Sequence, residues 1–139
     1  MKKNLLAIAL SLPMLLSAAA EAQTTQLRVA VPFEFIVGDT ALPAGYYDVH
    51  SIDPWGGREL SIHNVTSKAG TLFLSNLCQS AKTSDSNTLV FYRYGQKYFL
   101  AEVWTVNTNI GRQMLLNQRQ TELARNQQKG EVVLTASGK

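Results

Sequence analysis

The sequence predicts an all-β protein: a single antiparallel β-sandwich or barrel of about eight short strands with one short C-terminal helix. Three observations predict it. Short segments that alternate apolar and polar residues recur along the chain. Clusters of Gly, Pro, Asn, Asp and Ser separate them at short intervals, as in sandwiches and barrels. One segment near the C-terminus instead carries helix-start and helix-end signals.

The N-terminal residues have the pattern of a cleavable secretory signal. Lys2 and Lys3 form a positive start, and residues 5–16 are uncharged and mostly apolar. Small residues at Ala20 and Ala22 suit a signal peptidase. We expect cleavage after Ala22, with cleavage after Ala20 as the alternative. A membrane anchor is the rival interpretation, but the apolar stretch is shorter than the roughly 20 residues that span a bilayer.

The expected organisation is a signal peptide at 1–22 and a single β-domain at 23–139. The mature 117 residues suit one domain. Removing two lysines and one glutamate with the signal leaves a formal charge of +2. The basic residues form no run, which argues against a nucleic-acid partner. No later stretch is apolar enough to span a membrane after cleavage. One cysteine excludes an internal disulfide.

The first half of the mature chain reads as short strands. In the first, Leu27, Val29 and Val31 alternate onto one face, and Pro32 then interrupts the strand because it has no backbone donor. Loops at 53–57 and 66–70 contain the residues typical of turns. The predicted strands are Gln26–Val31, Phe33–Val37, Tyr46–Ile52, Glu59–Val65 and Thr71–Leu77, the last of which we expect to be buried.

A hairpin is the clearest element. Its strands, Leu89–Tyr94 and Lys97–Val103, flank Gly95-Gln96, and a glycine at the first central position suits a type II′ turn. Both faces are largely apolar, so the hairpin is central or one face meets something besides the core. The expected pairs are Tyr92 with Phe99, Phe91 with Leu100, and Val90 with Ala101.

The C-terminal part predicts a turn, a helix and a last strand. Residues 107–111 read as the turn, and residues 118–128 as a short surface helix. Asn117 is placed to cap the helix, with Gln120 three residues on and Gly130 just past the end. The last strand is Glu131–Thr135.

Two histidines, His50 and His63, are the first candidates for metal binding. They lie on neighbouring predicted strands. If Ile52 pairs with Leu60, the two rings point to opposite faces, whereas a one-residue slip would bring them together. Zinc takes three or four protein ligands, so we predict no metal site.

The other reactive side chains give no catalytic pattern. Cys78 follows Leu72, Leu74 and Leu77, which predicts a buried thiol rather than an intermolecular or reactive one. There is no Gly-x-Ser-x-Gly elbow. Among the acids inside predicted strands, Glu34 and Glu102 are the candidates for a catalytic carboxylate, and Glu102 has Arg93 on the same face as a more ordinary charge partner. We therefore expect no catalytic residue and no cofactor.

Aromatic residues are the remaining lead. Trp55 lies in a Pro/Gly loop, and Tyr92 and Phe99 share one face of the hairpin. Exposed aromatics in an exported β-domain can stack on sugar rings. Trp55, Tyr92 and Phe99 are therefore a possible ligand or partner surface, with ordinary packing as the alternative.

Three sequence blocks resemble a family of small exported bacterial proteins of unknown function. The first is Val31-Pro32-Phe33-Glu34-Phe35, then Val37-Gly38, then Leu42-Pro43-Ala44-Gly45-x-Tyr47. The second is Phe91-x-Arg93-Tyr94-Gly95-x-x-Tyr98-Phe99-Leu100, followed by Trp104, and the third is Gly111-Arg112 with Glu122-Leu123. The resemblance implies export and a β-rich fold. It implies no activity, cofactor or catalytic residue.

The leading hypothesis is an exported, periplasmic or extracellular, non-enzymatic binding or structural module with an unknown protein or glycan partner. One alternative is a binder of carbohydrate or small apolar ligands. The other is a small hydrolase with an unrecognised site, which a cleft bringing Glu34 or Glu102 beside a histidine would favour.

Overall fold

The computed structural model describes residues 26–53, 55 and 57–136, and the expected signal peptide and its cleavage site lie outside these residues. Within the described part there are ten strands and one helix, so the predicted all-β class is confirmed. In chain order the elements are β1 (Gln26–Val31), β2 (Phe35–Val37), β3 (Thr40–Leu42), β4 (Gly45–Ser51), β5 (Glu59–Asn64), β6 (Gly70–Gln79), β7 (Thr88–Tyr94), β8 (Lys97–Trp104), β9 (Ile110–Met114), α1 (Gln118–Asn126) and β10 (Lys129–Thr135).

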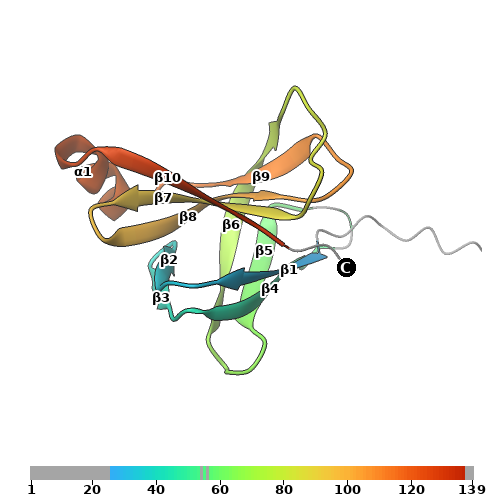
Figure 1. The fold of residues 1–139 in the computed structure, drawn as a ribbon, viewed down its shortest axis with the longest axis horizontal. Helices are drawn as coiled ribbons and strands as arrows, with labels where there is room; N and C mark the ends of the chain where they lie inside the picture. The colour runs from blue at the N-terminus through green and yellow to red at the C-terminus, as the bar shows by residue number, and fades with distance from the viewer. Residues whose placement is uncertain (1–25, 54, 56, 137–139) are drawn as a thin grey trace, which may run out of the picture.

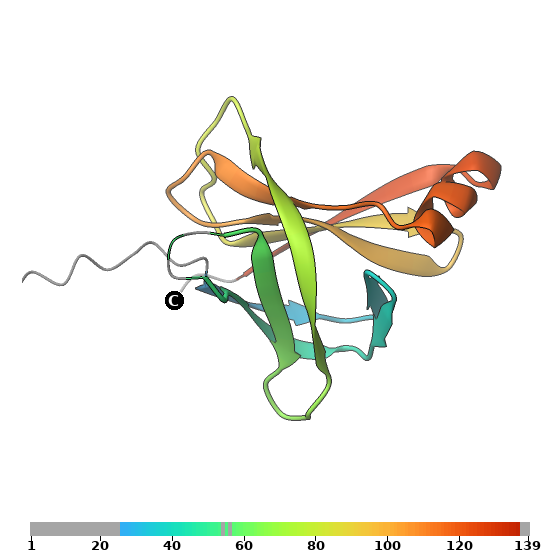
Figure 2. The same ribbon diagram turned by 180° about the vertical axis from the view of Figure 1, so that it is seen from behind.

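One sheet forms two layers by folding over on itself. The strand order runs β1-β4-β5-β6-β9-β8, and β7 and β10 continue from β8. Figure 1 shows β1, β4 and β5 in one layer and β7 to β10 in the other. Strand β6 crosses from the first layer to the second, and Figure 2 shows the same crossing from behind. The short β2–β3 hairpin joins β8 through a parallel pair, Ile36 with Phe99.

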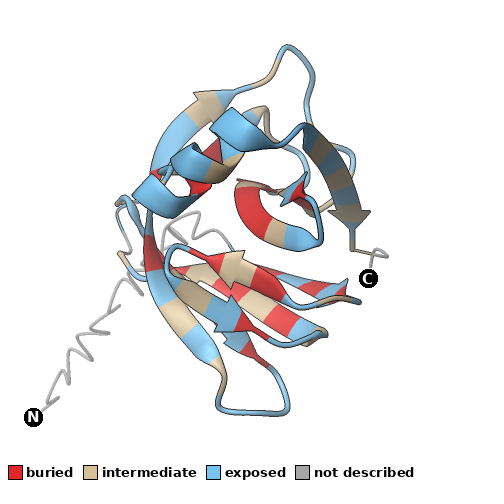
Figure 3. Ribbon diagram, turned by 90° about the vertical axis from the view of Figure 1, so that its left-hand side faces the viewer, coloured by how far each residue is buried: buried red, intermediate tan, exposed pale blue. Residues whose placement is uncertain are grey.

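The core lies between the two layers, where Figure 3 shows the buried residues gathering. Alternation decides which residues enter it: Leu27, Val29 and Val31 of β1 are buried, as the sequence predicts. Pro32 ends β1 as expected. Across the sheet, Tyr47 packs its ring on Phe35 at 5.0 Å. Leu60, Ile62, Leu89, Phe91, Leu100 and Val103 complete the centre of the cluster.

The β7–β8 hairpin has the predicted turn, with Gly95 at φ +63°. Phe91 pairs with Leu100 and Tyr92 with Phe99, as expected, but Val90 pairs with Glu102 instead of Ala101. A β-bulge between Val90 and Phe91 causes this difference. Side chains alternate along a regular strand, so in a regular β8 the side chain of Glu102 would lie on the core face with Leu100. The bulge adds one residue to β8 between these pairs. As a result, Val103 lies on the core face and Glu102 points outward.

The outer side of this hairpin is buried as well. Figures 1 and 3 place α1 at its closed end, on the side away from β1, β4 and β5. The buried Gln120 of α1 and the approach of Gln127 to Gly95 agree with this placement. A second group of buried apolar residues lies outside the main cluster: Val90, Tyr94, Phe99 and Ala101. The hairpin is therefore central, which was one of the two predicted outcomes.

Strand β6 differs from its prediction. The sequence predicts a buried strand over Thr71–Leu77, but only Phe73 and Ser75 point into the core. Leu72, Leu74 and Leu77 are exposed. The composition of the strand is apolar on both faces, but nothing in the described structure covers its outer face.

The remaining differences concern short elements. Strands β3 and β9 were not predicted, and β9 occupies Ile110–Met114, partly inside the expected 107–111 turn. The helix begins at Gln118 as predicted and ends two residues early. Its cap is also as predicted, because the Asn117 side chain accepts a hydrogen bond from the backbone N–H of Gln120 at 2.7 Å.

Candidate functional site

The histidine pair lies on the outer face of the β1–β4–β5 layer. Asp48 is directly opposite His63, and the ring centroids of His50 and His63 are 5.2 Å apart. Leu60 pairs with Ser51, one residue away from the Ile52 pairing that would point the rings to opposite faces, so the slipped alternative, which brings the rings together, is the one observed. The observed register places Val49 opposite Ile62, so both enter the core. Burial of one face specifies strand register, and both histidines consequently fall on the other face.

The carboxylate beside these rings already has a partner. Arg28 donates two hydrogen bonds to Asp48, at 2.6 and 2.7 Å, while Nε2 of His63 lies 3.9 Å from the same carboxylate. The Arg28 guanidinium lowers the pKa of Asp48, and the two histidines add to this effect. Among the described residues no group of three or more His, Cys, Asp or Glu is placed to hold a metal ion.

The three aromatic candidates do not form one surface. Trp55 is 90% exposed in the β4–β5 loop, whereas Phe99 is 1% exposed inside the second apolar group. The prediction that Phe99 belongs to an exposed surface is therefore wrong: its ring is buried beside that of Tyr94, with the two ring centroids 5.8 Å apart. Tyr92 is partly exposed, and the Lys129 ammonium lies 4.1 Å from its ring centroid.

The two acids considered for catalysis are not beside a histidine. Glu102 accepts hydrogen bonds from Nε1 of Trp104 at 2.8 Å and from the Tyr92 hydroxyl at 3.5 Å. Burial raises the pKa of the Tyr92 hydroxyl, and the negative charge of Glu102 raises it further. Glu34 is exposed between β1 and β2 and lines a pocket of about 260 Å³ with Lys97 and Arg119. No histidine is among the described residues that line this pocket.

Cys78 lies on β6 opposite Gly111 of β9. It is half-buried rather than fully buried, because the leucines expected to cover it point into solvent. Burial raises the pKa of the thiol, and the charge of Glu102 acts in the same direction. A thiol with a raised pKa has little thiolate at neutral pH and is a poor nucleophile.

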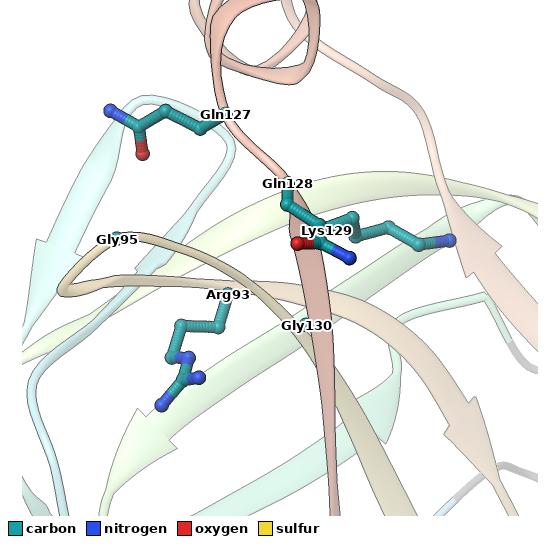
Figure 4. Close-up of a pocket in the computed structure, with 6 residues that line it drawn as sticks. All are labelled: Arg93, Gly95, Gln127, Gln128, Lys129 and Gly130. Atoms are coloured by element: carbon teal, nitrogen blue, oxygen red, sulfur yellow. The ribbon is translucent and has the colours of Figure 1, made fainter.

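The pocket at the closed end of the β7–β8 hairpin is open and polar. It has a volume of about 610 Å³ and is lined by Arg93, Gly95, Gln127, Gln128, Lys129 and Gly130. Figure 4 shows the Arg93 and Lys129 side chains pointing away from each other. Their charges therefore do not converge on one ligand position.

An apolar groove beside β6 is the strongest candidate site. It has a volume of about 410 Å³ and lies between β6, the β2–β3 turn and the segment that leads from β9 to α1. Four leucines line it, 42–62% exposed, and we call them the leucine patch: Leu72, Leu74, Leu115 and Leu116. Large contiguous apolar patches on protein surfaces are typical of interaction sites, which makes this groove the candidate.

The sequence contained part of the signal for this site. The apolar residues of β6 can be recognised in the sequence, but a strand that is buried on both faces has the same apolar pattern. Leu115 and Leu116 lie next to the expected turn and helix, where no strand was predicted. Only the arrangement of β6, β9 and α1 brings these residues together.

Scans against family models, curated proteins and solved structures give no match to this chain. The resemblance of its three sequence blocks to small exported bacterial proteins therefore stays a prediction. Within the described residues no helix has the length and apolar character needed to cross a membrane.

Proposed function

We propose that this chain is an exported, non-enzymatic binding module that holds a protein partner against the leucine patch. The observation that carries the proposal is the gathering of four exposed leucines around one groove. Fully burying one leucine is worth about 1.5–3 kcal/mol. Covering the patch would therefore contribute substantially to the affinity for a partner.

Two further features support the proposal. The Lys2-Lys3 start, the apolar stretch and Ala20-x-Ala22 support export to the periplasm or beyond. Two of the acidic side chains are engaged within the chain: Asp48 pairs with Arg28, and Glu102 with Trp104. These contacts favour binding over hydrolysis.

A carbohydrate-binding role is the second candidate, and Trp55 favours it because its ring is 90% exposed. Aromatic faces stack on sugar rings. A glycan array probed with the mature protein and with Trp55→Ala tests this role. Binding to a glycan that the variant loses would support it, and equal signals from the two proteins would contradict it.

Photo-crosslinking in the exporting host tests the main proposal. A benzophenone amino acid at position 74 should form a discrete adduct with one protein. Position 133 on β10 is the matched control, because Leu74 and Val133 are both 53% exposed. Adducts that are absent at position 74, or equal at 74 and 133, would contradict a partner at the leucine patch.

A further inference from the structure

Strand β6 has an open backbone edge beside the leucine patch. Residues 70–74 pair with β5 on one side, while pairing with β9 begins only at Ser75 with Met114. The other side of residues 70–74 therefore has no neighbouring strand among the described elements. This side faces the groove, which is lined by Thr71, Leu72, Phe73 and Leu74.

The ladder with β5 shows which backbone groups face the groove. The N–H of Asn64 donates to the carbonyl of Ala69 at 2.7 Å, and the N–H of Ser75 donates to the carbonyl of Arg58 at 2.8 Å. Hydrogen-bonded pairs alternate in an antiparallel ladder, so the residues that bond to β5 are the odd-numbered ones from 69 to 75. The N–H and C=O groups of Leu72 and Leu74 consequently point the other way, into the groove, where the Leu72 carbonyl also accepts a hydrogen bond from the Thr71 hydroxyl at 3.3 Å.

The walls of the groove limit what can enter it. Thr40 on β3 approaches Thr71 at one end, with their hydroxyl oxygens 3.4 Å apart, and residues 114–117 form the opposite wall. The edge therefore lies between these two walls, an arrangement that favours a single extended segment over the β6 edge of a second folded copy. Asp39 is the one charged residue among the described residues that line the groove. The site thus offers backbone donors and acceptors, apolar walls and one negative charge.

We propose that an extended segment of a separate polypeptide adds to β6 as a further strand along Leu72 and Leu74. This inference rests on the proposed function and specifies how the partner binds. Unpaired strand edges are templates for added strands, and the flanking side chains provide specificity. The bound segment carries apolar residues beside the leucine patch and Phe73, and a basic residue at the end near Asp39.

The β-domain itself does not point an end strand at the groove. β1 begins and β10 ends on the side of the molecule away from the β2–β3 hairpin (Figure 1). A second polypeptide therefore reaches the groove more directly than a continuation of either strand.

A designed peptide tests the inference on the mature protein. The probe is an acetylated, amidated Lys-Val-Thr-Val-Thr-Val, and the readout is binding together with NMR hydrogen exchange. We expect the amides of Leu72 and Leu74 to be protected when the peptide binds. Only alternate N–H groups of an added strand face β6. N-methylation at those positions of the peptide should therefore weaken binding about tenfold, while N-methylation at the positions between them should change binding little. Replacing its lysine by norleucine should weaken binding to the native protein but not to Asp39→Asn.

The outcomes separate this inference from the proposed function. Peptide binding that tolerates N-methylation everywhere and leaves both amides exchanging would overturn strand addition, while binding at the patch would stand. If the peptide does not bind but the photo-crosslinking experiment gives a specific adduct at position 74, strand addition is also overturned. If the peptide does not bind and position 74 gives no specific adduct, the proposed function itself is contradicted.

Discussion

The β7–β8 hairpin and strand β6 have similar apolar compositions but different surroundings. The hairpin lies between the main core and a second apolar group beside α1, so both of its faces are buried. β6 passes from one layer to the other with only its inner face covered, and Leu72 and Leu74 are left in solvent. An apolar run in the sequence therefore indicates a strand with two faces that can be buried. It does not indicate whether another part of the same chain buries them.

The largest expected effect comes from the inner face of the hairpin. Phe91 is fully buried, with Phe33 at 5.1 Å and Phe35 at 5.3 Å between ring centroids. We expect Phe91→Ala to reduce the free energy of unfolding by about 3–5 kcal/mol, because truncating a buried Phe leaves a cavity. Urea unfolding measures this change. A midpoint close to that of the wild type would show that the hairpin is peripheral.

The outer face of the hairpin should be nearly as sensitive. Phe99 is buried against Tyr94 but belongs to a smaller apolar group. We expect Phe99→Ala to cost about 3 kcal/mol, at the low end for a buried Phe. The same unfolding experiment compares it with Phe91→Ala. An unchanged stability would mean that this face is exposed in solution, and Phe99 would return as a surface candidate.

Cys78 tests whether β6 is protected near its C-terminal end. Because burial raises the pKa of the thiol, its thiolate fraction at neutral pH is below that of a free cysteine, whose pKa is about 8.5. We expect a thiol reagent at pH 7 to label native protein at least about tenfold more slowly than urea-unfolded protein, with the native rate rising as the pH increases. Equal rates in the two states would contradict the half-buried position.

The smallest effect on stability is expected at the leucine patch. Leu74→Ser should change the free energy of unfolding by less than about 0.5 kcal/mol, since the side chain is exposed. Phe73→Ala, its buried neighbour on the same strand, is the matched control and should cost about 3 kcal/mol or more. If the two variants were equally destabilised, the outer face of β6 would be covered in solution and the proposed binding site would be lost.

Local signals predicted much of the fold. Gly95 predicted the hairpin turn because a positive φ is accessible to glycine, and the observed φ is +63°. Asn117 predicted the helix start because its side chain can accept a bond from an orphan backbone N–H. The alternation of β1 predicted its buried face. Each of these features depends on residues close together in the chain.

Features that depend on distant residues were missed. The β4–β5 register follows from burying Val49 against Ile62, and the histidine cluster results from that register. The bulge in the hairpin keeps Glu102 out of the core, where an unpaired charge would be costly. β9 forms because its five residues pair with the neighbouring β8 on one side and with β6, more than 30 residues earlier in the sequence, on the other.

The all-β class, the hairpin and the capped helix follow from residue order alone, because turn chemistry, alternation and capping act within a few residues. Which apolar faces are covered depends on how the layers pack in three dimensions. Whether β6 finds a neighbour on its outer face and along residues 70–74 depends on where β3, β9 and α1 come to lie. Burial is a property of packed layers, and no local pattern along one strand contains it.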